Sequence, residues 1–439
     1  MDERKIRRSN FFKYIIPSIG AMLVTSLYVV VDGIFVGQGV GHNALGAINI
    51  AGPFIMVVVA LSMMVTVGGA TLSAIALAKK EEKEASRYFT LSMLLIVAFS
   101  VIMTLLTSFA SEPIVRLLGA DDTLASDAAC YLKYFVMFCV FFTSAQALAA
   151  FVRNDGSPNL SFVGMVLGGV SNIFLDWLFI FPLEMGIKGS AIASGLGQIL
   201  SCSILLSHFF MKKAKLKLSL SGFQGHDILE ICKRGTPEFM NQLFQPITVL
   251  CYNLLAMKVF GSIGVDSFSI VYYVLTITVA IFVGLTQGTQ PLISKAYGEG
   301  DKEGEKYYLR MGALVNLGLA LVVYIFVALL GKQIIWCFNS NEELIEIGYQ
   351  CMLIYGISFL PTSLMIVIIS NYTAKKETLK ALSLSSIRCL VLIPIFVFLT
   401  PLIFGNSVLW LGITLAELVA LGIALLMDKL MKKKSVEVI

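Results

Sequence analysis

The sequence predicts an all-α integral membrane protein with twelve transmembrane helices in two six-helix lobes. Its composition, the length of its apolar runs and an internal repeat lead to this fold class. Of the 439 residues, 57% are hydrophobic and only 14% are charged, and the mean hydropathy is +0.84. Soluble domains carry about 25% charged residues. A lipid bilayer is therefore the expected solvent for this chain.

Twelve apolar runs are long enough to cross the ~30 Å of hydrocarbon in a bilayer. They do not alternate as β-strands do, and lipid tolerates only helices and closed barrels. Each run is therefore predicted to be a helix. In chain order the runs cover 14–39, 50–78, 89–110, 130–152, 160–182, 188–211, 236–258, 267–294, 311–330, 347–372, 381–403 and 407–428.

The basic residues predict the orientation of these spans. With this set of spans, 27 of the 33 Lys and Arg residues fall on one side of the membrane, five fall on the other, and Arg388 lies within a span. Because basic residues gather on the cytoplasmic side, both termini are expected in the cytoplasm. The first span has no cleavage site after a short apolar core, so it is expected to be an uncleaved anchor.

The chain repeats itself at an offset of 219 to 220 residues. Pro17 matches Pro237, Gly69 matches Gly288, and EEKEASRY at 81–88 overlays GDKEGEKY at 300–307. Because six spans is an even number, the two halves should insert with the same orientation, related by a pseudo-twofold axis along the membrane normal. The predicted units are an N-lobe (1–211), a basic cytoplasmic linker (212–234) and a C-lobe (235–439).

Two carboxylates stand out inside the N-lobe spans. Asp32 interrupts the apolar stretch SLYVVVDGIFVG, and Asp176 lies at a similar depth in the fifth span, with Asn172 on the same helix face. Intramembrane charges usually mark functional sites, and two nearby desolvated carboxylates do not both ionise easily. This arrangement suits reversible proton uptake. A purely structural role would apply to one half only, since the repeat places Tyr252 and Phe396 at the equivalent positions.

Other polar residues within spans leave more than one interpretation open. Arg388 and Glu417 are expected to form a structural ion pair in the C-lobe. The Asn and Gln residues of spans 7 and 8 either line a water-filled pathway or bond helix to helix. Methionines would suit an adaptable cavity, although they are also common packing residues. The candidate substrate-contacting residues are Met22, Tyr28, Met63, Gln242, Gln245 and Gln287.

Several functional classes have no support in the sequence. There is no Walker motif, no HExxH motif and no plausible Ser/His/Asp set, so the protein is predicted not to be an enzyme, and transport would draw on an ion gradient. The three histidines are scattered and the cysteines form no CxxC pair, so neither a metal site nor a cofactor is expected. Nucleic acid is not an expected partner, and the protein is expected to function as a monomer.

The chain resembles the multidrug and toxic compound extrusion (MATE) family, and its bacterial MepA-like branch in particular. The resemblance covers nearly the whole chain. It rests on the spacing from Pro17 to Asp32, on RNDGSPNLSF at 153–162, on NIFLDWLFIF at 172–181 and on GIKGSAIASGLGQ at 186–198. It implies two lobes in a bacterial cell membrane and export of bulky, often cationic compounds against entering protons or sodium.

The resemblance also implies which residues couple transport to the ion. The family's N-lobe site maps onto Asp32, Asn172, Asp176 and Ser194, where Ser194 takes the place of a common Thr. The C-lobe sodium site of some members has no counterpart, because Gln245 stands where they have Glu and span 10 has no acidic residue beyond its first position. Proton coupling in the N-lobe is therefore favoured, with sodium at the same carboxylates as the alternative.

Other classes of function remain as alternatives. A flippase for lipid-linked saccharides would share the two-lobe plan, but Arg388 alone among basic residues lies well inside a span. A channel or a membrane scaffold would need neither the repeat nor the carboxylate pair. The sequence gives neither the physiological substrate nor the stoichiometry of exchange.

Overall fold

The computed structural model describes residues 3–122, 124–219, 225–338 and 341–437. Fourteen α-helices run through these residues, and no strand occurs among them. The helices of the N-lobe are α1 (Glu3–Gly39), α2 (His42–Ala78), α3 (Glu82–Leu117), α4 (Ala125–Met137), α5 (Cys139–Asn154), α6 (Pro158–Ile180) and α7 (Gly186–Ser207), which a 3-10 turn, η1 (His208–Phe210), follows.

The helices of the C-lobe begin with one long element and include two irregular stretches. They are α8 (Gly225–Glu299), α9 (Lys302–Phe338), α10 (Glu342–Gly356), α11 (Phe359–Ala374), α12 (Thr378–Ser386), the π-helical η2 (Ile387–Leu392), α13 (Ile393–Phe404), the 3-10 stretch η3 (Asn406–Leu411) and α14 (Gly412–Glu437).

These helices account for the twelve predicted spans and confirm the fold class. In the described part of the chain nine helices are long and apolar enough to cross a membrane, and two bent pairs, α4 with α5 and α10 with α11, each make one more span. As one straight helix, the 75 residues of α8 would reach ~110 Å, more than three times the hydrocarbon thickness. Gly261 breaks it with φ 65° and ψ −152°, so α8 contains two spans.

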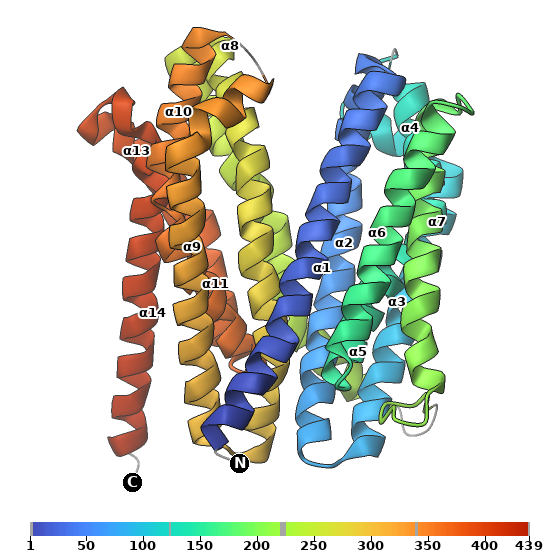
Figure 1. Cartoon of the computed structure of the whole chain (residues 1–439), viewed down its shortest axis with the longest axis vertical. Helices are drawn as coiled ribbons and strands as arrows, with labels where there is room; N and C mark the ends of the chain where they lie inside the picture. Colours follow the sequence, from blue (N-terminus) through green and yellow to red (C-terminus); the bar gives the residue numbers. More distant parts are fainter. Residues whose placement is uncertain (1–2, 123, 220–224, 339–340, 438–439) are drawn as a thin grey trace.

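The two lobes repeat their turns at a fixed offset. Positive φ angles occur at Gly41 and Gly261, at Lys80 and Gly300, and at Gly156 and Lys376, with members of each pair 220 residues apart. The bends within the two bent pairs, 48° and 45°, also fall at matching places. Figure 1 shows α1 to α7 grouped on one side and the C-lobe helices on the other. The structure therefore has the twofold repeat that the sequence predicts.

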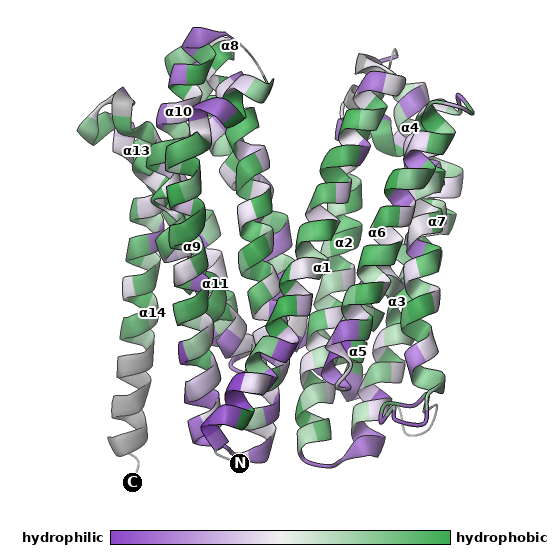
Figure 2. Cartoon of the chain, viewed as in Figure 1, coloured by the Kyte–Doolittle hydropathy of each residue, from purple (hydrophilic) through white to green (hydrophobic). Residues whose placement is uncertain are grey.

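The surface of the helices matches a bilayer environment. Figure 2 shows hydrophobic residues along the middle of the helices and hydrophilic residues concentrated toward their ends, most densely near the N-terminus. Exposed large apolar side chains include Leu105, Phe109, Leu329 and Leu402. A soluble protein would rarely expose apolar area on this scale, so these helices face lipid.

Helix α8 begins at Gly225, inside the segment predicted as a linker. The basic composition of that segment favoured a linker, but its last residues form the start of α8. Ile231 is buried there against α2, and its carbonyl oxygen lies beside Gly68. Residues 220–224 of the predicted linker lie outside the described residues. The part before them, 211–219, is held on the N-lobe, because Asp155 pairs with His208 (2.8 Å) and accepts a hydrogen bond from the Lys215 amide (3.0 Å).

The lobes contact each other at the end that holds the N-terminus (Figure 1). Gly284 and Gly288 of α8 let this helix approach the backbone of α1, since a Cβ on them would lie 2.7 Å from Ile19 Cα and 2.8 Å from the Tyr14 carbonyl oxygen. Polar contacts join the lobes at the same end: Arg7 with Asp301 (3.1 Å), Arg153 with Gln287 (3.2 Å) and Gln290 with Thr71 (3.1 Å). We call this set of contacts the lobe interface.

Candidate functional site

The carboxylate pair lies where three N-lobe helices meet. Helix α1 carries Asp32, α6 carries Asn172 and Asp176, and α7 carries Ser190 and Ser194. Helices α6 and α7 pack closely because both are glycine-rich: a Cβ on Gly197 would lie only 2.7 Å from the Gly168 carbonyl oxygen. This close approach brings the polar faces of the two helices together beside α1.

Each polar group of this site has a defined position. Ser190 Oγ donates a hydrogen bond of 2.7 Å to Asp32 Oδ1, and Asn172 Nδ2 donates one of 3.2 Å to Ser194 Oγ. Asp176 is fully buried, and Asp32 and Asp176 are close enough to interact electrostatically. All four residues predicted as the ion-coupling site thus lie in one cluster, which we call the carboxylate site.

The carboxylate site has more acceptors than donors. Both carboxylate oxygens of Asp176 and the Asn172 side-chain oxygen are buried and have no hydrogen-bond partner among the described residues. A buried acceptor without a donor costs about 1–3 kcal/mol. A proton or a small cation would satisfy these oxygens, so the arrangement is chemically suited to binding one.

Sequence reasoning missed two residues near this site. Ser190, four residues before Ser194 on the same face of α7, is the residue that contacts Asp32. Its place in GSAIAS, one helical turn from Ser194, was the available signal. Tyr131 of α4 also lies close enough to both carboxylates to interact with them, as does Tyr28. Tyr28 was predicted as a substrate contact, and the structure places it near the carboxylate site.

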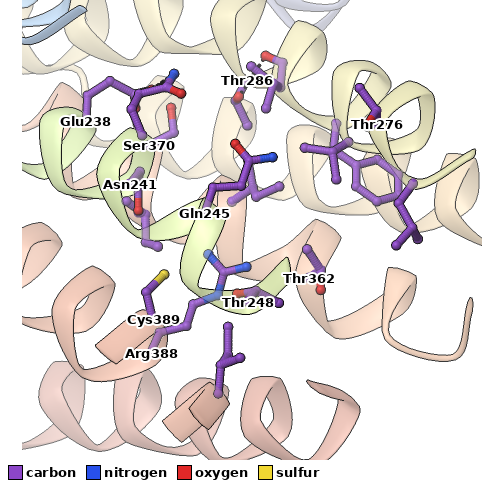
Figure 3. A pocket seen from close by; sticks show the side chains of 18 of the residues that line it. Glu238, Asn241, Gln245, Thr248, Thr276, Thr286, Thr362, Ser370, Arg388 and Cys389 are labelled. Carbon is purple, nitrogen blue, oxygen red and sulfur yellow. Dashed lines mark hydrogen bonds between the residues drawn. The ribbon is translucent and has the colours of Figure 1, made fainter. Parts of the chain in front are cut away.

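A second polar site occupies the C-lobe. A cavity of about 260 Å³ lies among α8, α11, η2 and the Met63 region of α2. Four predicted substrate-contacting residues line it: Met63, Gln242, Gln245 and Gln287. We call it the C-lobe cavity, and Figure 3 shows the labelled part of its lining. Met22 lines a smaller, adjoining cavity of about 60 Å³, which shares Met63 and Gln287 with the C-lobe cavity.

The ion pair expected in the C-lobe is present. Arg388 Nε lies 2.9 Å from both carboxylate oxygens of Glu417, which is fully buried and also accepts a hydrogen bond of 3.1 Å from Thr362. Arg388 stands on the π-helical stretch η2 and lines the C-lobe cavity. The position equivalent to Asp32 holds Tyr252, which packs at 0% exposure against Trp410. The carboxylate site therefore has no copy in the C-lobe.

Two repeated six-span lobes, with buried carboxylates in one and a polar cavity in the other, define a multi-pass membrane protein built like a secondary transporter. The family model described as MatE matches residues 17–178 and 237–399, one segment in each lobe. The chain belongs to the MatE family. The prediction that it is a transport protein and not an enzyme is confirmed by this membership.

Relatives and solved structures match over the whole chain. The Multidrug export protein MepA of Staphylococcus saprophyticus is 24% identical, with 97% of this chain and 95% of the relative covered. MepA of Staphylococcus aureus is 23% identical, with 96% and 94% covered. A crystal structure of MATE in complex with MaL6 matches with TM-score 0.92 at 22% identity, covering 99% and 98%.

A MOP superfamily transporter from Pyrococcus furiosus, described by the reverse polarity of its binding pocket, matches with TM-score 0.89 at 23% identity, covering 97% and 96%. The two structural matches establish the shared fold.

Proposed function

We propose that this protein is a secondary active multidrug efflux transporter. It exports bulky, often cationic organic compounds in exchange for protons that enter through the carboxylate site. The export proteins among its relatives support the substrate class. The observation that supports ion coupling is the environment of Asp176. This carboxylate lies beside Asp32, is fully buried, and has no hydrogen-bond partner in the part of the chain that the structure describes.

Helix α1 is the element through which an ion at this site would act on the substrate pathway. Asp32 lies toward one end of α1, while Ile15 and Ile19 of the same helix pack against α8 at the lobe interface. Protonation of Asp32 removes the charge that accepts from Ser190. The packing of α1 on α6 and α7 then changes, and with it the contact between the lobes. Pro17 gives α1 a place to bend.

The orientation and location of the protein are part of the same proposal. The basic residues favour a cytoplasmic position for the end that holds the N-terminus. The lobes contact each other at that end, which corresponds to an outward-facing state. The bacterial relatives favour the cell membrane. The protein would act as a monomer, because each chain supplies both lobes.

Gradient-driven flux in proteoliposomes tests the coupling. Purified wild type and Asp32→Asn are reconstituted with a fluorescent lipophilic cation, and a proton gradient or a sodium gradient is imposed separately. We expect the proton gradient to drive flux in wild type and Asp32→Asn to abolish it. Asp266→Asn, a change at an exposed carboxylate on α8, should behave as wild type.

The other possible results of the flux experiment would each change the proposal in a different way. Flux driven only by sodium would keep efflux and replace the coupling ion. Full proton-driven flux in Asp32→Asn would contradict coupling at the carboxylate site. If no cation moved under either gradient, a flippase for lipid-linked saccharides would become the leading function.

A further inference from the structure

The C-lobe cavity contains a charged face that the carboxylate site does not explain. Glu238, Asn241, Gln242 and Gln245 all line the cavity. Their spacing of i, i+3, i+4 and i+7 places them on one face of α8. Lipid would disfavour such a face, so its side chains are directed into the cavity. On this face the Asn241 side-chain oxygen is buried and has no hydrogen-bond partner among the described residues, so it is a free acceptor.

Glu238 has no cationic partner among the described residues. Its polar neighbours are the amide of Gln242, which donates a hydrogen bond of 3.2 Å, and the amide of Asn241. None of the ion pairs within 4.0 Å in the described part of the chain includes Glu238. Arg234, one turn earlier, is already paired with Glu230 at 2.9 Å and bonded to the Lys376 carbonyl oxygen at 2.6 Å. The Glu238 carboxylate is therefore available to a ligand.

Arg388, the other charged residue among those that line the cavity, is neutralised by its ion pair with Glu417. Glu417 accepts hydrogen bonds from Nε and Nη2 of the Arg388 guanidinium and one more from the Thr362 hydroxyl. Figure 3 shows Glu238 and Arg388 on different sides of the cavity, with the Gln245 amide between them. Glu417 does not line the cavity, but it balances the charge of Arg388. The described lining together with Glu417 therefore has a net charge of −1 when Glu238 is ionised.

We propose that the C-lobe cavity binds a small organic cation and that Glu238 is its counter-charge. Glu417 holds Arg388 so that the guanidinium does not cancel Glu238. The amide oxygens of Gln242 and Gln245 add favourable dipoles for the positive charge. Aromatic side chains of the lining, among them Phe268 and Tyr272, pack on the apolar part of the ligand. The volume of about 260 Å³ is close to the lower end of small-molecule sites, which favours a ligand with one or two rings.

This inference rests on the proposed function, and it separates two tasks within the chain. The driving ion binds at the carboxylate site of the N-lobe, and the cationic substrate binds at Glu238 in the C-lobe. Helix α8 connects them, since it carries Glu238 in its first span and Gly284 and Gly288 of the lobe interface in its second.

Equilibrium binding to the purified full-length protein in detergent tests the proposal without any gradient. The probes are N-methyl-4-phenylpyridinium, a permanent cation, and 4-phenylpyridine N-oxide, a neutral molecule of similar shape. Wild type should bind the cation at least tenfold more tightly than the neutral probe. Glu238→Gln should weaken binding of the cation about tenfold and leave binding of the neutral probe unchanged. Unchanged binding of the neutral probe also shows that the cavity is intact.

Three further variants sharpen the result. Glu417→Gln should also weaken binding of the cation, because Arg388 then loses its counter-charge and repels a cation in the cavity. Glu238→Asp should retain the preference for the cation. Glu343→Gln, a change at an exposed carboxylate at the start of α10, should bind both probes as wild type does.

Two sets of results would overturn the proposal. One is equal affinity of wild type and Glu238→Gln for the cation, or a failure of wild type to bind it. The other is an equal loss of affinity for both probes in Glu238→Gln, together with no binding of either probe to Glu238→Asp. This result would assign Glu238 a structural role. Normal gradient-driven flux together with either result would reject the site and keep the efflux function. A preference for the cation that depends on Glu238, found without any gradient-driven flux, would keep the site and reject the efflux function.

Discussion

Ser190 is the residue that distinguishes the two carboxylates of the N-lobe. It donates a hydrogen bond to Asp32, whereas Asp176 has no donor among the described residues. A hydrogen bond to a charged group contributes about 1.5–3 kcal/mol, and it favours the ionised form. Proton uptake at the carboxylate site should therefore depend strongly on this hydroxyl.

Ser190→Ala should shift the pH dependence of proton-driven flux toward higher pH. Removing the donor makes ionised Asp32 less favourable, so the proton stays bound until a higher pH. Because one pH unit corresponds to 1.36 kcal/mol, the loss of about 1.5–3 kcal/mol predicts a shift of about one to two units. It is measured as the pH of half-maximal flux in proteoliposomes. Ser203→Ala is the matched control, since Ser203 is exposed on the same helix and its hydroxyl bonds to the Ile199 carbonyl oxygen of α7 itself. Equal shifts in both variants would contradict the specific role of Ser190.

The sequence could reveal the carboxylates but not their hydrogen-bond donor. Asp32 and Asp176 stand out because a charge in an apolar run is costly. Serine is common in membrane helices, so the choice between Ser190 and Ser194 depends on how α7 is rotated against α1. That rotation follows from the contact of Gly197 with Gly168, which has no signature in a single sequence. The sequence places Glu238 near the cytoplasmic end of the seventh span, where contact with water is expected, and so does not mark it as a site residue. Its lack of a cationic partner among the described residues depends on the pairing of Arg234 with Glu230.

At the level of elements, the break in α8 depends on one glycine. The angles of Gly261, φ 65° and ψ −152°, lie in a region that only glycine adopts readily. The sequence predicted two spans here from length alone. It could not predict the bends of α4–α5 and α10–α11 or the π-helical η2, because the packing of neighbouring helices produces them and the apolar runs continue through them.

Gly261→Ala should lower the stability of the protein by about 1–3 kcal/mol, since a Cβ strains this backbone conformation. Thermal unfolding of the purified protein in detergent should show this as a transition a few degrees below that of wild type. Gly422→Ala provides the comparison. Gly422 lies inside α14 with nothing within 4 Å of an added Cβ, so alanine should leave stability unchanged or raise it slightly. An unchanged transition in Gly261→Ala would show that α8 relaxes around the break without strain.

At the level of the whole molecule, the two lobes meet through helix backbones and few charged groups. Glycines at positions 284 and 288 allow α8 to touch α1. The buried Arg153 donates to Ser18 within its own lobe and to Gln287 across the interface. Such a contact can separate without exposing many unpaired charges. It is therefore suited to opening and closing during transport, when one state must not be far more stable than the other.

Gly288→Ala should shift the molecule away from the state described by this structure. An added Cβ would lie 2.8 Å from the Tyr14 carbonyl oxygen and 2.9 Å from Ile15 Cα, and crowding of this kind costs about 1–3 kcal/mol. That energy changes the ratio of two states by about 5- to 150-fold. Spin labels would replace the exposed residues Glu81 and Lys306, near the lobe interface. Double electron–electron resonance would report the change as a second, longer distance between the labels.

Gly318→Ala is the matched control for this experiment, because nothing lies within 4 Å of its added Cβ. It should give the wild-type distance distribution. If Gly288→Ala also gave that distribution, the lobe interface would tolerate the methyl group by local adjustment, and α1 would not need to separate from α8 at this point. A longer distance in Gly288→Ala alone, together with slower proton-driven flux, would tie the opening of this interface to transport, because the contact that the methyl group disrupts belongs to the same helix that carries Asp32.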